Sequence, residues 1–262
     1  MNKNKIFVSK INLLNKVERK NYSDKLQQFE KQFTYPLGNQ TFYIQHGLNT
    51  DYFTFFEKLG EPQIMILEKN NQIIGLCCAI LRTINGKKIW YLCDFKISKE
   101  FRGQKLYQKL MWKYFLNSYL KCQKVFAVNM SPSNNNRLFY YTKNIFKFFN
   151  FKIKEQYLHS FDAYHLKNFS NQFWTNHLIV TNNGEKDIII LQESQKLFHI
   201  VDKQNYLNNL QKYQTVNIQN INSNDKIMLL SNKSLKLNFA EETIISLFSN
   251  TNHFFYISSL EI

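Results

Sequence analysis

The sequence predicts a mixed α/β fold with a mostly antiparallel sheet flanked by helices. Three strand-like segments follow one another closely, separated by Asn70-Asn71 and by Asn85-Gly86. Dipeptides of this kind favour two-residue hairpin turns. The third strand leads through a short turn into an amphipathic segment and then into another apolar strand. This strand–helix–strand order implies one parallel crossover beside an antiparallel meander.

The first part of the chain contains nine expected elements. Helices are expected at 15–33, 52–59, 106–121 and 135–149, and strands at 63–69, 73–84, 87–98, 124–130 and 152–161. The third helix has two adjacent apolar stripes, so a wide face of it should pack against the sheet. The segment Tyr35–Thr50, between the first two helices, is expected to be a loop that helps to form the acceptor pocket.

The chain changes character past about His165, where Asn and Gln become more frequent. Strands are expected at 177–182, 187–193, 197–201, 225–231 and 253–259, and helices at 206–213 and 240–248. Asn183-Gly184 predicts a hairpin between the first two of these strands. We therefore expect two domains, residues 1–164 and a smaller α/β unit over 165–262. The second unit contains no chemical motif, and its role is left open.

Composition limits the classes of partner. The 262 residues carry a formal net charge of +15, which favours polyanionic partners such as phosphorylated cofactors or nucleic acid. The lysines are scattered, however, and the chain is rich in Lys, Asn, Ile and Phe throughout, as an AT-rich genome would produce. Nucleic acid is therefore a partner that the sequence allows without favouring it.

Other sequence features point to a cytoplasmic protein with reduced thiols. The N-terminal segment lacks the apolar core and cleavage site of a secretory signal, and the longest apolar run, at 73–81, is too short to span a membrane. The four cysteines are not spaced like a ligand cluster, so no metal is expected. Motifs for serine hydrolases, P-loop nucleotide binding and zinc proteases are absent from the sequence.

The segment Tyr91-Leu92-Cys93-Asp94-Phe95-Lys96-Ile97, followed by Phe101-Arg102-Gly103, resembles the strand and phosphate loop of the GNAT superfamily of N-acetyltransferases. The order of elements over residues 1–164 is also similar to that of the family. The family's loop motif, Gln/Arg-x-x-Gly-x-Gly/Ala, falls on residues 102–107. Lys105 and Tyr107 replace its two glycine positions.

The resemblance implies that acetyl-CoA is the co-substrate. Backbone N–H groups at the start of a helix attract anions, so the loop should hold the pyrophosphate of coenzyme A. Lys105 is expected to take a helical first-turn conformation, and Tyr107 is either a core residue, a neighbour of the adenosine or a plug. The implied cofactor-binding residues are Phe95, Lys96, Ile97, Arg102, Gly103, Gln104, Lys105, Leu106, Tyr107 and Asn134.

Asp94 and Tyr141 are the predicted catalytic residues. Strand alternation places Asp94 on one face with Trp90, Leu92 and Lys96, where burial would raise its pKa and suit a general base or an ammonium-binding group. A salt bridge or a solvent-facing acid is the alternative. Tyr141 follows Asn134 at the family's spacing and would protonate the departing thiolate.

The family's usual alanine between Asn134 and Tyr141 is replaced by Arg137. Tyr140 is a substitute for Tyr141, and a tyrosine that simply packs in an aromatic helix is the structural alternative. The sequence thus predicts an N-acyltransferase that acts by direct attack of an amine on an acyl-CoA. A catalytically degenerate binding protein of the same fold, for CoA, nucleic acid or a protein, is the alternative function.

Overall fold

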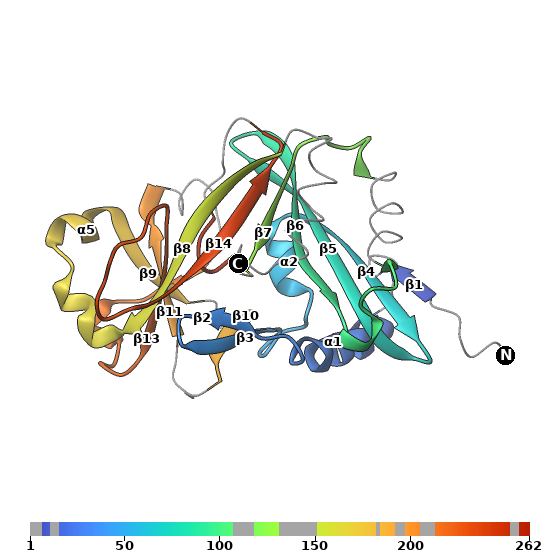
Figure 1. Ribbon diagram of the computed structural model, residues 1–262, viewed down its shortest axis with the longest axis horizontal. Helices are drawn as coiled ribbons and strands as arrows, with labels where there is room; N and C mark the ends of the chain where they lie inside the picture. Colours follow the sequence, from blue (N-terminus) through green and yellow to red (C-terminus); the bar gives the residue numbers. More distant parts are fainter. Residues whose placement is uncertain are drawn as a thin grey trace.

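The chain is organised around one large sheet (Figure 1). The computed structural model describes residues 7–10, 16–106, 118–130, 151–181, 184–191, 197–204, 213–251 and 257–262. Within these residues the large sheet has eleven strands, in the order β1-β4-β5-β6-β7-β14-β8-β13-β11-β9-β12. A second sheet has three strands, in the order β10-β3-β2.

The described elements in the first part of the chain are both helices and strands. They are β1 (Phe7–Lys10), α1 (Lys16–Glu30), β2 (Tyr35–Leu37), β3 (Gln40–His46), α2 (Thr54–Leu59), β4 (Glu61–Lys69), β5 (Gln72–Ile84), β6 (Lys87–Ile97), β7 (Val125–Asn129) and β8 (Lys152–Asp162). The later elements are mostly strands. They are α5 (Asn171–Asn176), β9 (His177–Thr181), β10 (Lys186–Ile190), β11 (Leu197–Asp202), β12 (Gln214–Thr215), β13 (Lys226–Ser231) and β14 (Glu241–Ser249).

The mixed, mostly antiparallel architecture predicted from the sequence is confirmed. Among the described strands of the large sheet, β6–β7 and β11–β13 are the parallel neighbours. Strands β4, β5 and β6 form the predicted meander. Its two-residue turns contain Asn70, Asn71, Asn85 and Gly86, whose φ angles lie between +50° and +73°. Asparagine and glycine tolerate this left-handed region, which explains why these dipeptides mark the turns.

The predicted crossover leads from β6 to the parallel strand β7. Leu106 and Ser118 are helical, at the two ends of the predicted helix, and residues 107–117 lie outside the described part of the chain. The predicted helix over 135–149 also lies outside it, as does most of the helix predicted at 206–213. The strand predicted at 253–259 is described from Ile257 onward, and there the chain is not extended into a strand.

The helix predicted at 240–248 is wrong, because this segment forms strand β14. It lies between β7 and β8 and pairs with both (Figure 1). Ile245 and Leu247 are buried on one face of the strand, and Phe248 is buried as well. A short apolar run fits a buried helix and a central strand equally well by periodicity, so the partners on either side decide the outcome.

The loop predicted at Tyr35–Thr50 is also wrong over most of its length. Strands β2 and β3 occupy it, and β3 pairs with β10 from the second half of the chain. The hairpin predicted at Asn183-Gly184 does not form between neighbouring strands, because β9 and β10 belong to different sheets. Local turn signals could not reveal a partner that lies about 140 residues away.

The main core draws on both halves of the chain. One cluster of buried residues joins Leu26 and Phe29 of α1 to Ile188 of β10, Ile245 of β14 and Ile262. The boundary predicted at residue 164 stays a prediction about domains, but the large sheet and this core continue across it. No helix in the described residues has the length and apolar character needed to cross a membrane.

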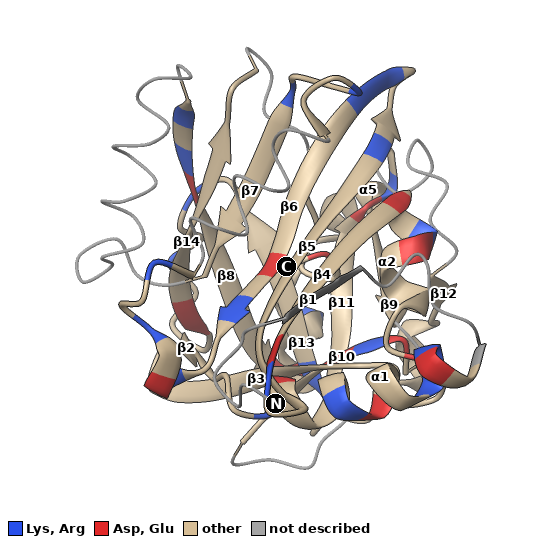
Figure 2. Cartoon of the chain, turned by 90° about the vertical axis from the view of Figure 1, so that its right-hand side faces the viewer, with Lys and Arg blue, Asp and Glu red and all other residues tan. Residues whose placement is uncertain are grey.

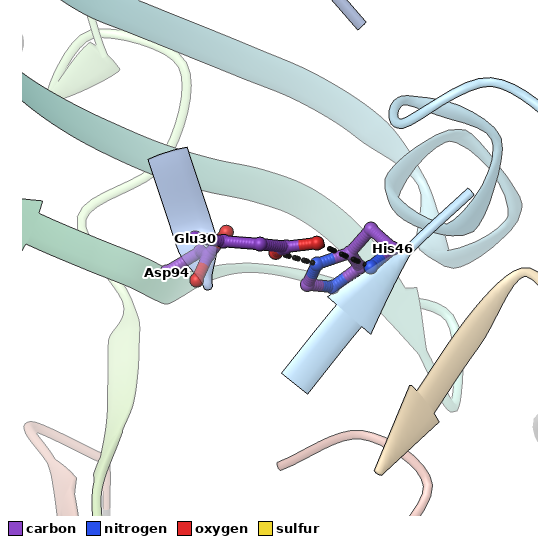
Figure 3. Close-up of side chains that lie close together, drawn as sticks. All are labelled: Glu30, His46 and Asp94. Atoms are coloured by element: carbon purple, nitrogen blue, oxygen red, sulfur yellow. Dashed lines mark hydrogen bonds and ion pairs between the residues drawn. The ribbon is translucent and has the colours of Figure 1, made fainter. Parts of the chain in front are cut away.

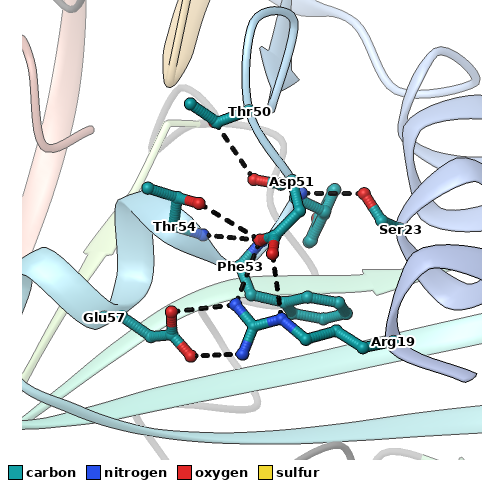
Figure 4. A network of polar contacts seen from close by, with 8 residues as sticks. Arg19, Ser23, Thr50, Asp51, Phe53, Thr54 and Glu57 are labelled. Carbon is teal, nitrogen blue, oxygen red and sulfur yellow. Dashed lines mark hydrogen bonds and ion pairs between the residues drawn. The ribbon is translucent and has the colours of Figure 1, made fainter. Parts of the chain in front are cut away.

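The connection between β3 and α2 is fastened to α1 by Arg19 (Figure 4). Its guanidinium binds Asp51 at 2.9 and 3.1 Å and Glu57 at 2.6 and 2.8 Å. The backbone N–H of Tyr52 donates to Ser23 Oγ of α1 at 2.8 Å. These contacts fix the position of Tyr52, whose side chain reaches β6.

Candidate active site

Strand β6 contains a β-bulge at Asp94. Leu76 of β5 pairs with Lys96 and Cys78 pairs with Cys93, so Cys77 alone faces two residues of β6, Asp94 and Phe95. Asp94 has a φ of +50°, in the left-handed region. For a residue other than glycine this conformation costs about 1–2 kcal/mol, so the surrounding contacts must hold it in place.

The bulge places Asp94 on the opposite face from the one predicted. Strand alternation predicted that Asp94 shares a face with Trp90 and Leu92, but these two side chains pack in one cluster while Asp94 contacts Tyr52 of the other. The extra residue in β6 shifts the alternation by one, so that Cys93 and Asp94 lie toward the same side. The prediction failed because a bulge leaves no signal in an apolar strand sequence.

Asp94 belongs to a buried cluster of charged and polar side chains. Its Oδ2 accepts a hydrogen bond of 2.6 Å from the Tyr52 hydroxyl, and its Oδ1 forms an ion pair with the Lys96 ammonium. Lys96 Nζ also lies 3.6 Å from Glu30 Oε2. The side chains of Asp94, Lys96 and Glu30 are 7%, 2% and 0% exposed, so this cluster lies inside the protein.

Glu30, the last residue of α1, binds both the backbone and the side chain of His46 at the end of β3 (Figure 3). Its Oε1 accepts from the His46 backbone N–H at 2.5 Å, and its Oε2 lies 2.8 Å from His46 Nδ1. The rings of Tyr52, Phe55 and Phe56 surround the imidazole, with centroid distances of 4.7–5.4 Å. The cluster therefore joins α1, β3 and β6.

The pKa of Asp94 moves in the opposite direction from the prediction. Burial alone would raise it, but the charges of Lys96 and His46 and the hydrogen bonds from Lys96 and Tyr52 outweigh burial and lower the pKa to about 2. Burial alone would likewise lower the pKa of Lys96, whereas the charges of Asp94, Tyr35 and Glu30 raise it. Both members of the pair are therefore charged at neutral pH.

A metal ion does not fit this cluster well. Glu30, His46 and Asp94 each place a potential ligand atom within 4.8 Å of the others. The ammonium of Lys96 lies against both carboxylates, however, and would repel a divalent cation at that position. The arrangement is that of a buried ion-pair cluster.

Lys186 of β10 brings the second half of the chain to this region. It pairs across the small sheet with His46, and its ammonium lies 4.7 Å from the centroid of the Phe55 ring. The ammonium donates to the main-chain oxygens of Leu260, at 3.2 Å, and of Ile262. Burial lowers the pKa of Lys186 to about 8.

Strands β6 and β7 stop pairing immediately before the bulge. Their pairing covers Trp90–Leu92 of β6 and Val125–Ala127 of β7, although β6 continues to Ile97 and β7 to Asn129. On its other side β7 pairs with β14 over Phe126–Asn129. The described pairing between β6 and β7 thus ends before Cys93, while β6 continues beside β5.

The predicted phosphate loop follows β6 directly. A 3₁₀ turn at Lys99–Phe101 leads to Gly103, with a φ of +81°, and to the buried Leu106, where a helix starts. Arg102 Nε donates to the carbonyl oxygen of Ile97 at 3.1 Å, so this side chain fixes the loop onto the end of β6. Gln104 and Lys105 are exposed on the loop.

Lys105 departs from the expected helical conformation. Its φ is +56°, in the region that favours glycine, and it stands at the first glycine position of the family motif. The backbone at Lys105 thus has the geometry of a glycine position. The loop therefore contains a lysine in a strained backbone conformation. Neither the charge of lysine nor its helix propensity explains why it adopts this conformation.

The structure brings together some predicted site residues and leaves others undescribed. The side chain of Phe95 packs in the cluster with Leu106, on the other face of β6 from Asp94, while Lys96 points into the charged cluster. Tyr107, Asn134 and Tyr141 lie outside the described residues. Sequence reasoning missed Glu30, His46, Tyr52 and Lys186, because they come from four separate elements and carry no shared local pattern.

Comparison with known proteins identifies the class of this part of the chain. Residues 26–145 match the model of the acetyltransferase (GNAT) family. This range contains the β6 bulge, the end of the pairing between β6 and β7 and the loop at 98–106. The family resemblance predicted from the sequence is confirmed over this segment.

Individual relatives are distant. An uncharacterized protein of Acanthamoeba polyphaga mimivirus is 30% identical over 105 residues, which make up 34% of this chain and 31% of that protein. The chain thus spans about a third of the length of the curated relative that it matches.

Several solved structures are similar in fold at low identity. A GCN5-related glucosamine N-acetyltransferase region of a fungal multi-domain β-N-acetylglucosaminidase has 7% identity and a TM-score of 0.48, covering 94% of this chain and 38% of that one. A probable N-acyltransferase of Enterococcus faecalis has 11% identity and a TM-score of 0.42, covering 94% and 72%. Glucosamine-6-phosphate N-acetyltransferase of Arabidopsis thaliana has 17% identity and a TM-score of 0.34, covering 53% and 90%.

Proposed function

We propose that this protein is an N-acyltransferase that transfers an acetyl group from acetyl-CoA to an amine by direct attack. The observation that carries the proposal is the end of the pairing between β6 and β7 directly before a bulge, inside the segment that matches the acetyltransferase family. Where two neighbouring parallel strands stop pairing with each other, an extended acyl-pantetheine arm can lie between them.

The loop after β6 is the proposed site of the pyrophosphate. Gly103, Gln104, Lys105 and Leu106 lead into a helix start, where the helix dipole favours an anion, and their amides with that of Tyr107 are the proposed pyrophosphate donors. Arg102 supports the loop through its hydrogen bond to Ile97. The pantetheine arm is proposed to run along Phe95–Ile97, with Asn134 as a further contact.

The chemistry requires an uncharged amine, stabilisation of the thioester oxygen and a proton for the thiolate. The amine nitrogen attacks the thioester carbon and the C–S bond breaks. The amide of Phe95 or Ile97 polarises the carbonyl, Tyr141 protonates the leaving thiolate, and the proton lost by the nitrogen passes to solvent. The earlier assignment of Asp94 as general base is weakened by its contacts. A carboxylate with a pKa of about 2 is a poor acceptor of a proton from an alkylammonium group.

The proposal is tested first by cofactor binding. Calorimetric titration of the purified protein with CoA and with acetyl-CoA should give one site with micromolar affinity, and mass spectrometry should detect CoA that copurifies. Release of free thiol from acetyl-CoA is then measured across a panel of small amines, amino sugars and peptides. Binding without thiol release on any amine would favour the catalytically degenerate alternative, and absence of binding would overturn the proposal.

A further inference from the structure

We propose that Asp94 is a positioning residue, whose carboxylate locks the β6 bulge at the point where β6 leaves β7. The inference rests on the proposed function and assigns Asp94 a different part in it from that of a general base. It follows from the backbone conformation of Asp94, from the partners of its two oxygens and from the elements that supply those partners.

The backbone at Asp94 needs to be held. Its φ of +50° is unfavourable for most residues, and the bulge interrupts the pairing of β6 with β5 between Cys93 and Lys96. Without a restraint, β6 could regain regular pairing by moving the extra residue along the strand. Such a slip would turn the amides of Phe95 and Ile97 away from their present directions.

The side chain supplies the restraint through both oxygens. Oδ2 accepts from the Tyr52 hydroxyl at 2.6 Å, and Oδ1 contacts the Lys96 ammonium. Tyr52 is fastened to α1 through Ser23, and Lys96 reaches Glu30 at the end of α1. Two connections therefore hold the bulge against α1. One runs through Asp94, which precedes Phe95, and the other through Lys96, which follows it.

The same contacts exclude a direct role as proton acceptor. The Asp94 side chain is 7% exposed, and both of its oxygens already have strong partners. Each oxygen keeps a further lone pair, but the buried Tyr52 and Lys96 and the low exposure of the side chain leave a substrate amine little access to it. Asp94 thus acts on the site through the backbone of β6.

The inference is tested by substitutions at position 94 that change the tolerance of a positive φ and the negative charge independently. Asparagine tolerates a positive φ and can keep the hydrogen bond with Tyr52, and glycine tolerates the φ without any side chain. Valine is β-branched and does not tolerate it. Because Asp94→Asn removes the nearer of the two carboxylates beside the buried Lys96 ammonium, it is combined with Lys96→Met in a double variant. Cys93→Val introduces the same valine side chain one residue earlier, at a φ that is not positive.

The readouts are the Kd for CoA by calorimetry and the kcat and KM for acetyl-CoA with the best amine of the panel. We expect Asp94→Asn with Lys96→Met, which keeps the φ and the hydrogen bond with Tyr52, to keep kcat within about fivefold. Asp94→Gly, which removes the restraint, and Asp94→Val, which also strains the backbone, should each weaken CoA binding more than tenfold. Cys93→Val should weaken CoA binding less than threefold. Thermal melts identify any variant that fails to fold.

Two results would overturn the inference. One is a loss of about a hundredfold in kcat in both the Asn-containing and Gly variants with an unchanged Kd for CoA, which is the behaviour of a general base. The other is CoA binding by folded Asp94→Val as tight as that of the wild type. Should Asp94→Val not fold, the Asn and Gly variants still decide. Failure of the wild type to bind CoA would instead remove the proposed function.

Discussion

Lys105 occupies a backbone conformation that normally belongs to glycine, and this conflict is local to one residue. Its φ is +56° and its side chain is exposed, so burial of the side chain does not compensate for the strained backbone. The neighbouring Gly103, with a φ of +81°, has the same backbone geometry without the conflict. A residue that tolerates a positive φ at position 105 should therefore make the protein more stable.

Lys105→Gly should stabilise the protein, whereas Lys105→Ala should not. Glycine removes about 1–2 kcal/mol of strain and loses about 0.5–1 kcal/mol through the entropy of the unfolded chain, which leaves a net gain below about 1.5 kcal/mol. Both variants lose the same exposed charge, so both should weaken CoA binding equally, by about 1 kcal/mol or less. Thermal melts and calorimetry measure the two effects. Equal melting temperatures for the Gly and Ala variants would contradict the strain argument.

His199 should make the protein sensitive to acid. Burial, with the charge of Lys186 as a smaller cause, lowers the pKa of His199 to about 3, and its Nδ1 lies 3.0 Å from Ser259 Oγ. Between pH 6.5 and 3 the unfolded chain binds a proton that the native state does not, so stability falls as pH falls through this window. By pH 5 the loss should approach about 2 kcal/mol.

Urea unfolding at pH 7, 6 and 5 measures this slope, and His199→Gln should reduce it. Glutamine cannot titrate and can still bond to Ser259. Burial also lowers the pKa of His159, so a smaller slope of the same sign should remain in the variant. A variant that loses stability with acid as steeply as the wild type would place the effect elsewhere.

The residues that define the site differ in how far the sequence could reveal them. The position of Gly103 followed from a local motif, because a strand that turns sharply into a helix needs a permissive residue. Glu30, His46 and Tyr52 could not be found in this way. Each is an ordinary residue in its own segment, and only the tertiary packing of α1, β3 and β6 makes them neighbours.

At the scale of elements, the loop after β6 can be compared directly with the hairpin between β5 and β6, because each contains a glycine with a positive φ. Gly103 and Gly86 have φ angles of +81° and +73°, and a Cβ atom added at either one would meet no atom of the described residues within 4 Å. A valine at either position is therefore strained through its backbone alone. The two elements differ in whether their amides belong to the proposed phosphate site.

Gly103→Val should abolish most CoA binding, while Gly86→Val should leave the affinity unchanged. Both substitutions should destabilise the fold by a similar amount, about 1–3 kcal/mol, because the strain is of the same kind. Calorimetric titration with CoA and thermal melts on the two variants provide the comparison. If both variants bind CoA as the wild type does, the pyrophosphate lies somewhere other than this loop.

Element prediction succeeded where neighbours in sequence are neighbours in space. The meander β4–β5–β6 was readable because its turns contain asparagine and glycine in their preferred conformations. Strand β14 was not, because its partners β7 and β8 lie about 90 to 120 residues earlier in the chain. An apolar segment without a nearby partner keeps its helical and extended alternatives open until the whole sheet is assembled.

At the scale of the whole molecule, the two halves of the sequence build one core. Lys and Arg residues, which give the net charge of +15, lie on many separate elements rather than on one face (Figure 2). Among the described residues, the charge therefore defines no single docking surface for a polyanion. The clearest feature at this scale is the last segment, residues 257–262, which is buried against both halves.

Contacts of this last segment reach the strands of the proposed acyltransferase site. Glu261 forms a buried ion pair of 2.8 Å with Arg82 of β5, and its main-chain oxygen accepts from the Tyr91 hydroxyl of β6 at 2.5 Å. The ring of Tyr91 stacks on Phe126 of β7, at the last stretch where β6 and β7 pair. Removing one partner of a buried ion pair typically costs about 3–5 kcal/mol.

A chain that ends near Lys167 should consequently fail to fold or to bind CoA, contrary to what two independent domains would predict. It loses β14 from between β7 and β8, β10 from beside β3, and the partner of Arg82. Coexpression with residues 168–262 should restore a soluble complex that binds CoA, since the missing strands pair without a covalent link. Solubility, near-ultraviolet circular dichroism and calorimetry with CoA compare the truncated chain, the coexpressed pair and the full chain. A truncated chain that is folded and binds CoA with full affinity would show that the first 167 residues form the site on their own.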